Sequence, residues 1–262
     1  MTQHQTITSF GYKWRTFPII HPQWQHHLTM YGFTLPAFQR FIHGKTVLDA
    51  GCGMAWRTHW FRTLNPSGIV IGLDAAKAAV HTGNNLLDAD LVVGDLQQLP
   101  FQPNSFDYIA CEGVIHHTPD PRRYLAEVAR MLKPRGTMTL YIYRQKPLTR
   151  RLVDTLLRAC TTQLTPTACL AVCRAITTLG HLLYTINATL QALIYQYVVK
   201  CFWDWHAHSY ETSLAVNFDW YHPQYAHSFT DAEVRDLVAD AGLEVASVTP
   251  LMSAFAVKAV RP

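Results

Sequence analysis

A short segment near residue 50 constrains the fold more than any other part of this 262-residue chain. Residues 47–50 are mostly apolar, Gly51-Cys52-Gly53 follows them, and Trp56 opens a stretch of helical composition. A buried parallel strand has such an apolar run, and glycines without a Cβ let a ligand lie against the backbone. The N-terminus of the following helix offers unpaired N–H groups to a polar ligand. The segment therefore predicts the ligand-facing turn of a doubly wound α/β sheet.

Two later segments predict strands that lead to an acidic residue. Residues 68–74 end at Asp74, and residues 91–96 contain Asp95 near their end. Ligands of doubly wound sheets bind at the carboxyl ends of the strands, so both acids are expected at the same edge as the glycine turn. A carboxylate at Asp74 can accept hydrogen bonds from both hydroxyls of a ribose. The pattern predicts a nucleotide-like ligand.

The glycine turn resembles motif I of the class I S-adenosylmethionine (SAM) dependent methyltransferases. Residues 47–53 read V-L-D-A-G-C-G. A dinucleotide fingerprint, G-x-G-x-x-G, would need a third glycine, whereas Trp56 and Arg57 follow Ala55 here. The family usually has glycine at the position of Ala55, close to the methionine end of SAM, so the alanine is a departure from the family pattern at the end where the chemistry occurs.

Further segments match the same family in order. Residues 113–121 (GVIHHTPDP) resemble its GVLHHLPDP segment, and residues 132–136 (LKPRG) resemble its LKPGG turn. Residues 217–225 (NFDWYHPQY) resemble an FDWYSPxY segment of several bacterial methyltransferases. The resemblance is to a type-11-like methyltransferase domain; it runs through residues 45–144 and resumes near residue 217.

The resemblance implies a seven-stranded doubly wound α/β sheet with a helical insertion between strands 5 and 6. Its last two strands, at residues 244–248 and 253–260, are expected to form an antiparallel edge hairpin. It also implies SAM as cofactor, with Asp95 meeting the adenine amino group. The residues expected to bind SAM are Tyr12, Trp14, Arg15, Asp49, Gly51, Cys52, Gly53, Asp74, Ala75, Asp95, Leu96, Cys111 and Glu112.

Composition excludes several classes of protein. Hydrophobic residues make up 49% of the chain and charged residues 15%, which predicts an ordered core. The net charge of +4 is mild and no run of Lys or Arg occurs, so nucleic acid is not expected as a partner. No signal peptide and no C-x-x-C pair are evident, which predicts a cytoplasmic protein. Cys169 and Cys173 lie one helical turn apart, but without two further ligands no metal site is expected.

The pattern divides the chain into four parts. Residues 1–44 form an N-terminal segment that closes over the cofactor pocket, and residues 45–146 form the SAM-binding core. Residues 147–205 form a helical cap, and residues 206–262 complete the core with the C-terminal strands. In this last part Thr230 begins a capping-box sequence for a helix. Earlier in the chain, Asp120 is expected to cap a helix that begins at Pro121.

The helical insertion contains a long stretch without charges. Between Arg174 and Lys200 there is no Asp, Glu, Lys or Arg. Such a length could span a bilayer, but threonine, asparagine and glutamine recur on every face of the expected helix. We therefore expect a cap over the active site or a homodimer contact rather than membrane contact.

The N-terminal segment carries aromatic and basic residues together. Residues 10–18 read FGYKWRTFP, and similar methyltransferases have an FGYxW segment ahead of the domain. Aromatic faces attract cations such as the SAM sulfonium. The alternative is that this segment simply packs the N-terminus against the fold.

Methyl transfer from a sulfonium is an in-line displacement that mainly requires positioning and exclusion of water. A base is needed only if the acceptor must lose a proton. His116, after the fourth strand, is the candidate base, although a structural histidine is the alternative. Tyr221 and Tyr210 are the further catalytic candidates, because each can carry a hydroxyl into a site. They belong to an aromatic group that either walls a substrate pocket or packs a core, comprising Trp203, Trp205, Tyr210, Trp220, Tyr221 and Tyr225.

Three functions remain open from the sequence. The first is methyl transfer to a small molecule, for example in natural-product biosynthesis, in a capped, aromatic-lined pocket. The second keeps SAM but directs a nucleophile to another carbon beside the sulfonium, so that cyclisation or aminocarboxypropyl transfer releases methylthioadenosine. The third is a membrane-associated or partner-binding protein that retains the fold without the activity.

Overall fold

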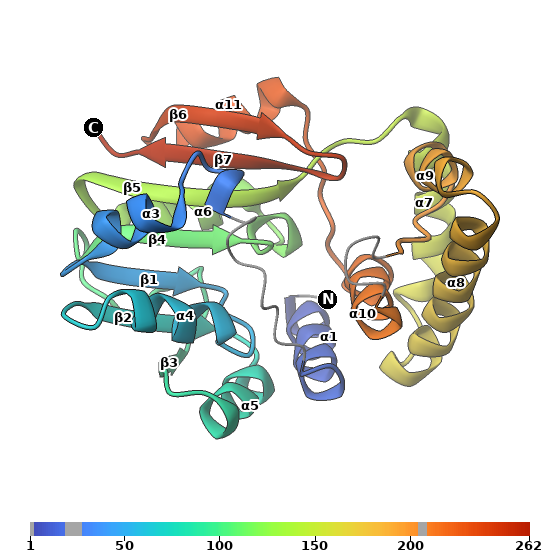
Figure 1. Cartoon of the computed structure of the whole chain (residues 1–262), viewed down its shortest axis with the longest axis horizontal. Helices are drawn as coiled ribbons and strands as arrows, with labels where there is room; N and C mark the ends of the chain where they lie inside the picture. The colour runs from blue at the N-terminus through green and yellow to red at the C-terminus, as the bar shows by residue number, and fades with distance from the viewer. Residues whose placement is uncertain (1–2, 19–27, 204–208) are drawn as a thin grey trace. The chain divides into compact units, whose positions relative to one another are not determined.

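The computed structural model of the chain describes residues 3–18, 28–203 and 209–262. It divides into two compact units (Figure 1). The sheet unit comprises residues 20–145 and 227–262, and the helical unit comprises residues 1–19 and 146–226. Each unit has a hydrophobic core of its own. Trp205, which belongs to the aromatic group of the sequence, lies outside the described residues.

Within the described residues, the sheet unit contains seven strands in the order β3-β2-β1-β4-β5-β7-β6. The first five in this order are parallel, and β7 pairs antiparallel with β5 and with β6. The predicted doubly wound sheet with an antiparallel edge hairpin is therefore confirmed. The strands are β1 (Thr46–Ala50), β2 (Ile69–Asp74), β3 (Asp90–Val93), β4 (Phe106–Glu112), β5 (Leu132–Tyr143), β6 (Glu244–Pro250) and β7 (Ala254–Val260).

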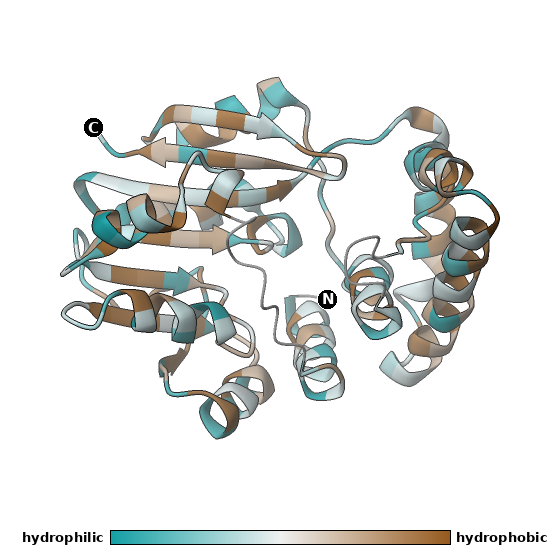
Figure 2. Ribbon diagram, viewed as in Figure 1, coloured by the Kyte–Doolittle hydropathy of each residue, from teal (hydrophilic) through white to brown (hydrophobic). Residues whose placement is uncertain are grey.

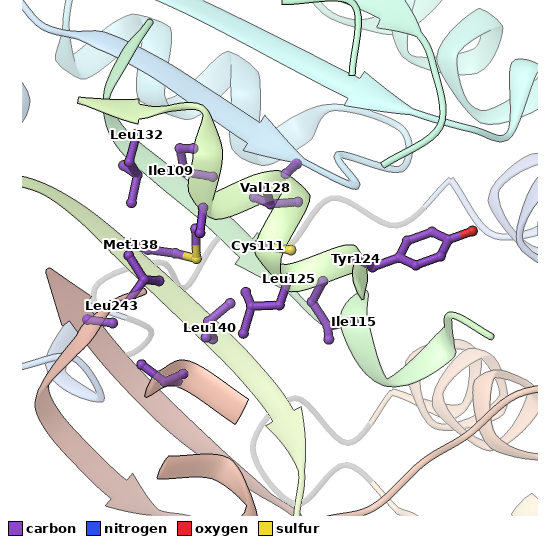
Figure 3. Close-up of a cluster of buried hydrophobic side chains, with 14 of the residues drawn as sticks. Ile109, Cys111, Ile115, Tyr124, Leu125, Val128, Leu132, Met138, Leu140 and Leu243 are labelled. Atoms are coloured by element: carbon purple, nitrogen blue, oxygen red, sulfur yellow. The ribbon is translucent and has the colours of Figure 1, made fainter. Parts of the chain in front are cut away.

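Two buried clusters form in the sheet unit because successive side chains of a strand point to opposite faces. On β4, Tyr108 packs edge-on against Phe38, with ring centroids 5.6 Å apart. The next residue, Ile109, belongs to the other cluster with Leu125 and Val128 (Figure 3). The helices around the sheet are α3 (Leu35–Ile42), α4 (Trp56–Leu64), α5 (Lys77–Leu86), the short 3₁₀ helix η1 (Ile115–His117), α6 (Pro121–Arg130) and α11 (Asp231–Asp240).

Side-chain caps begin two of these helices where the sequence predicts them. Asp120 accepts a hydrogen bond from the N–H of Arg123 at the start of α6. Thr230 accepts from the N–H of Glu233, whose carboxylate accepts from the N–H of Thr230 at 2.7 Å. This reciprocal capping box satisfies two backbone donors that a helix end leaves unpaired.

The helical unit contains five helices among the described residues, with apolar side chains at their contacts. Its buried cluster joins α8 to α10 through Cys169, Cys173, Leu214 and Phe218. Three of its helices fall in the predicted insertion at residues 147–205. The helices are α1 (Gln3–Thr16), α7 (Leu148–Thr161), α8 (Pro166–Ile186), α9 (Ala188–Tyr197) and α10 (Tyr210–Tyr221).

The two units divide the chain differently from the predicted four parts. Helix α10, expected in the remainder of the core at residues 206–262, belongs to the helical unit. Its buried residues Leu214, Phe218 and Tyr221 pack with residues of α8, which explains the grouping. Helix α1, from the N-terminal segment, also belongs to this unit and contacts α10.

Candidate functional site

The glycine turn after β1 has a backbone that other residues adopt rarely. Gly51 and Gly53 have φ angles of 79° and 57°, which glycine tolerates because it lacks a Cβ. A Cβ on Gly51 would lie 2.3 Å from Cγ2 of Val114, so the turn passes directly against the segment after β4. The N–H groups of Gly51 and Cys52 both donate to the carbonyl of Leu73, at 2.7 and 3.0 Å. These bonds tie the turn to the end of β2.

Ala55 occupies a strained backbone position at the end of this turn. Its φ of 68° lies in the left-handed region immediately before α4, which costs an L-residue roughly 1–2 kcal/mol. Its N–H donates to the carbonyl of Cys52 at 2.9 Å. Glycine would adopt this conformation without that cost, which gives a physical reason for glycine at this position in other chains.

Asp74, at the end of β2, is held beside the turn by backbone donors. Its Oδ2 accepts from the N–H of Gly53 at 2.9 Å, and its Oδ1 accepts from the N–H of Ala76 at 2.7 Å. Ala75 lies half-buried between them. The carboxylate is half-buried, so a ligand at the carboxyl edge of the sheet can reach it.

Asp95 and Leu96 follow β3 at the same edge. The N–H of Gly94 donates to the carbonyl of Asp74 at 3.0 Å, which brings the segment after β3 next to the end of β2. Asp95 is half-buried and accepts from the N–H of Gln97 at 2.9 Å. Leu96 is buried in the larger cluster. The structure thus gathers the glycine turn, Asp74 and Asp95 along neighbouring strands.

A buried arginine binds two of the acidic residues that sequence reasoning predicted as SAM contacts. Arg57 of α4 donates to Oδ1 of Asp49 through Nε at 2.9 Å and Nη2 at 2.5 Å. Its Nη1 donates to Oε2 of Glu112 at 3.0 Å. Thr58 donates to Asp49 and Thr139 donates to Glu112, at 2.8 and 3.0 Å. Burial alone would lower the pKa of Arg57, but the two carboxylates raise it above its ordinary value.

Sequence reasoning missed the role of Arg57. One local signal was available, because Arg57 stands at the start of the helix that follows the glycine turn, eight residues after Asp49 at the end of β1. That signal does not identify the partner on β4, which lies 55 residues away in the sequence. The network therefore joins β1, α4 and β4 at the edge of the sheet that carries the glycine turn.

The two cysteines of the predicted site are buried thiols. Burial, with Asp49 and Asp74 nearby, raises the pKa of Cys52 well above its ordinary value. Burial likewise raises the pKa of Cys111 to about 12, and this side chain lies in the larger cluster (Figure 3). Both thiols stay protonated near neutral pH, so they shape the site as apolar groups and do not act as nucleophiles.

His116 lies inside the sheet unit, directly after β4. It is fully buried in η1, and its ring stacks on Tyr143 with centroids 3.7 Å apart and planes 24° apart. The His117 ring lies 4.4 Å from the His116 ring. The carbonyl of His116 accepts from the N–H of His227 at 2.8 Å. The imidazole is thus fixed at the carboxyl edge of the sheet by its neighbours.

The structure places the other two catalytic candidates in the helical unit. Tyr221 is fully buried, and its hydroxyl donates to the carbonyl of Lys200 at 3.1 Å. Burial raises the pKa of Tyr221 above its ordinary value. Tyr210 is exposed, and its hydroxyl donates to the carbonyl of Arg174 at 3.2 Å. Both hydroxyls therefore bond to backbone carbonyls of their own unit.

The three N-terminal candidates also belong to the helical unit, on α1. The Tyr12 ring lies 5.7 Å from the Phe218 ring, and the Trp14 ring lies 3.9 Å from Nζ of Lys13. Arg15 donates to the carbonyl of Gly11 at 3.3 Å. Within this unit Tyr12 therefore contacts α10, whereas these contacts of Trp14 and Arg15 lie within α1.

A cluster of buried charges in the helical unit was also missed by sequence reasoning. Lys13 pairs with Asp219 at 2.6 Å, and Nζ of Lys200 lies 5.1 Å from the Trp220 ring. Burial lowers the pKa of Lys200 to about 7, although Asp219 opposes the shift. Burial raises the pKa of Asp219.

The shifted pKa of Lys200 predicts how the stability of the chain depends on pH. An unfolded lysine loses its proton near pH 10.4, whereas folded Lys200 does so near pH 7. Between these values the unfolded state binds the additional proton, so stability should rise with pH over this interval. Lys200→Met should remove this rise, and Lys77→Met, at an exposed site on α5, should keep it. Urea unfolding at pH 7, 8.5 and 9.5 measures both slopes; equal slopes in all three proteins would contradict the prediction.

Part of the sheet unit matches a known family model. Residues 48–140 match the family model for a methyltransferase domain. The chain is 38% identical over 98 residues to a demethylmenaquinone methyltransferase of Staphylococcus carnosus, covering 36% of this chain and 41% of that protein. It is 34% identical to the corresponding enzyme of Listeria welshimeri, covering 38% and 45%. The chain thus spans less than half the length of these curated relatives.

Two solved structures are similar over nearly the whole chain. One comes from the complex between the Haloferax volcanii Trm112 methyltransferase activator and a methyltransferase; it has a TM-score of 0.56 and 17% identity and covers 100% of this chain and 98% of that one. The other is a SAM-dependent methyltransferase from Aquifex aeolicus, with a TM-score of 0.52, 16% identity and coverage of 93% and 95%. At these identities the likeness establishes the fold.

Proposed function

We propose that this chain binds SAM at the carboxyl edge of its sheet and transfers the methyl group to a small molecule. The match of residues 48–140 to the family model of a methyltransferase domain supports this proposal. The observation that carries the proposal is the hydrogen bond of 2.9 Å from Gly53 to Asp74. It sets a glycine turn and a reachable carboxylate side by side, on adjacent strands of a doubly wound sheet. This is the place where such sheets bind nucleotides.

Each part of this edge fits one part of the cofactor. The turn at Gly51 and Gly53 lets the ligand approach the backbone, and a Cβ at Gly51 would displace Val114. Asp74 accepts from the ribose hydroxyls. Asp95 accepts from the adenine amino group, and Leu96 supplies an apolar contact beside it. Ala75 contributes backbone next to the ribose.

The network around Arg57 acts on the methionine end. Asp49 and Glu112 were predicted to bind SAM, and their ion pairs with Arg57 support a role in fixing the ends of β1 and β4 at that place. The buried thiols of Cys52 and Cys111 add an apolar lining. Tyr12, Trp14 and Arg15 complete the cofactor set that we propose, on the argument that aromatic faces attract the sulfonium.

Methyl transfer from SAM requires the protein mainly to position the two reactants. Bound SAM supplies a methyl carbon on a positively charged sulfur. The protein's share is to align the acceptor with that carbon and to exclude water. His116 is the residue that we propose to take a proton from the acceptor, because it is the buried imidazole fixed at this edge.

For the acceptor we propose a small organic molecule. The relatives that match this domain are named for methyl transfer to demethylmenaquinone, which supports a small-molecule acceptor. The aromatic residues of the helical unit support an apolar or aromatic acceptor, such as a natural product. Tyr210 and Tyr221 are the hydroxyl-bearing residues that we assign to binding of this acceptor.

One assay tests the proposed function. The protein is incubated with SAM and a panel of phenolic, quinone and amine acceptors, and the released nucleoside is identified by mass spectrometry. Release of S-adenosylhomocysteine that depends on an acceptor supports methyl transfer. Release of methylthioadenosine from SAM alone would overturn it in favour of cyclisation.

Asp74→Ala should weaken SAM binding by about 1–3 kcal/mol, or roughly 5- to 150-fold in Kd, because ribose hydroxyls lose their acceptor. Asp90→Ala, on the exposed end of β3, is the matched control and should leave Kd unchanged. Calorimetry with S-adenosylhomocysteine measures both. Equal affinity in the Asp74 variant and the wild type would show that the ribose lies elsewhere.

His116→Gln should lower kcat while leaving the affinity for S-adenosylhomocysteine unchanged, because glutamine keeps a polar group but cannot accept a proton. His59→Gln, on α4, is the control and should leave kcat unchanged. Steady-state kinetics with an acceptor found in the panel measures the difference. A loss of cofactor affinity without a loss of kcat would assign His116 to structure instead.

A further inference from the structure

Three consecutive helices of the helical unit expose large apolar side chains. These side chains are between 41% and 75% exposed, whereas leucine and isoleucine are among the residues most often buried. Figure 2 shows the hydrophobic colour recurring along α8 and α9. The residues are Leu148, Leu152 and Leu156 on α7, Leu179, Leu182 and Ile186 on α8, and Leu190, Leu193 and Tyr197 on α9.

On α8 the exposed and buried residues lie on opposite faces. Leu179, Leu182 and Ile186 follow the i, i+3, i+7 spacing of a single helix face. Thr177 and Gly180 are buried, and they fall on the other side of the helix. The backbone of α8 thus has one face in the core of its unit and a second apolar face in solvent.

The other two helices repeat this arrangement. On α9 the exposed side chains have the same i, i+3, i+7 spacing, opposite buried Gln191 and Tyr195. On α7 they follow i, i+4, i+8, opposite the buried pair Arg150 and Asp154. Helix α9 contacts both α7 and α8. Scattered exposed leucines need no explanation, but three adjacent helices with the same pattern do.

Helix α8 is more apolar than an ordinary surface helix, but one of its sides packs against other helices of the unit, unlike a helix surrounded by lipid. Among the described residues it is the one helix long and apolar enough to cross a bilayer, and 28% of its most apolar window is buried. It packs against α10 and α9 along its length, with Cys169 and Cys173 fully buried. A helix held in a bundle on one side can rest in the plane of a lipid interface with its other side.

The charges of these helices fit an anionic lipid surface. From Thr155 to Trp203 the sequence contains no Asp or Glu. Asp154, the acidic residue of α7, is buried and paired with Arg150 at 2.6 Å. The exposed charges on α7 and α8 are therefore basic, at Arg151 and Arg174. Basic residues beside an apolar helix face strengthen binding to anionic lipids.

We propose that the outer faces of α7, α8 and α9 bind the surface of an anionic lipid bilayer. The apolar side chains enter the boundary between headgroups and acyl chains, and Arg151 and Arg174 contact the acidic headgroups. This surface belongs to the helical unit. Its binding to lipid needs neither SAM nor an acceptor, so it is tested independently of the proposed methyl transfer. The sequence favours a cap or a dimer contact over membrane contact; the proposal differs from this expectation only for the surface of the bilayer and involves no span through its interior.

The test is flotation of the full chain with lipid vesicles at 0.15 M salt. Vesicles of phosphatidylcholine with roughly 30% anionic phosphatidylglycerol are compared with vesicles of phosphatidylcholine alone, because an anionic surface attracts basic residues. We expect the chain to float with the anionic vesicles. The combined variant Leu179→Ser, Leu182→Ser and Ile186→Ser should reduce the bound fraction by about tenfold or more, because three apolar side chains no longer leave water.

Two matched variants separate the parts of the proposal. Ile69→Thr with Leu86→Ser changes exposed apolar residues of the sheet unit and should leave flotation unchanged. Arg151→Glu with Arg174→Glu should abolish the preference for anionic over neutral vesicles. Far-ultraviolet circular dichroism and a urea unfolding curve in lipid-free buffer show whether each variant keeps its helices and its stability.

Three results would overturn the proposal. The first is no flotation of the wild-type chain with either vesicle. The second is an equal loss of flotation in the Ile69/Leu86 variant, which would make the binding nonspecific. The third is a wild-type dimer in lipid-free solution that the α8 variant converts to a monomer, without flotation, which would assign the face to a second copy of the chain.

Discussion

Replacing Arg57 by methionine should lower the free energy of unfolding by about 3–5 kcal/mol, the range measured when one partner of a buried ion pair is removed. Methionine is similar in length but cannot donate to Asp49 or Glu112, whose side chains are 0% and 3% exposed. Asp49 would keep its hydrogen bond from Thr58, and Glu112 its hydrogen bond from Thr139. Urea unfolding at neutral pH measures the loss.

Arg62 is the matched control for this prediction. It lies on the same helix and pairs with Asp90 at 2.5 Å, but both side chains of this pair are well exposed. Arg62→Met should therefore cost no more than about 1 kcal/mol. The combined variant Arg57→Met, Asp49→Asn and Glu112→Gln should recover part of the loss, because no charge is then left buried. Equal losses in the Arg57 and Arg62 variants would show that the buried network contributes no special stability.

The parts of the fold that sequence reasoning predicted correctly are those with local signals. The run of residues 47–53 combines a strand pattern with obligatory glycine positions, and the structure shows why, since Gly51 has a left-handed φ and no room for a Cβ. The cap at Asp120 and the capping box at Thr230 are equally local. Such features depend on neighbours within a few residues, which a single sequence displays.

The missed features depend on partners that are distant in the sequence. Arg57 bridges β1 and β4, and Lys13 pairs with Asp219 across 206 residues. Helix α10 overlaps the segment at residues 217–225, where the resemblance to the methyltransferase core resumes. Its apolar face nevertheless packs against α8. Propensity cannot choose between two possible partners for an apolar face, because tertiary packing decides it.

In the candidate site, too, the features with local signals were predicted and those with distant partners were missed. Gly51, Gly53, Asp74 and Asp95 were predicted from strand ends, and parallel strands bring their carboxyl ends to one edge. For Asp49 and Glu112 the residues were predicted, but not the arginine that pairs with both. The contributions of Tyr210 and Tyr221 stay predictions, because their hydroxyls bond within the helical unit.

Gly51→Ala should destabilise the chain by about 2–5 kcal/mol and sharply weaken SAM binding. An alanine at φ 79° costs roughly 1–2 kcal/mol. Its Cβ would also lie 2.3 Å from Cγ2 and 2.8 Å from Cγ1 of Val114, and overpacking of this kind costs about 1–3 kcal/mol. Relief of the clash must move the turn or the segment after β4, and both belong to the proposed cofactor site. Urea unfolding and calorimetry with S-adenosylhomocysteine measure the two effects.

Gly44→Ala separates the backbone cost from the clash. Gly44 has a φ of 69°, but a Cβ there would have nothing within 4 Å, so only the cost of about 1–2 kcal/mol is expected, with unchanged cofactor affinity. The double variant Gly51→Ala, Val114→Ala removes both Cγ atoms of Val114 and should recover most of the difference between the two single variants. If Gly51→Ala and Gly44→Ala lost the same stability and both kept full affinity, close contact between the glycine turn and Val114 would have no part in forming the site.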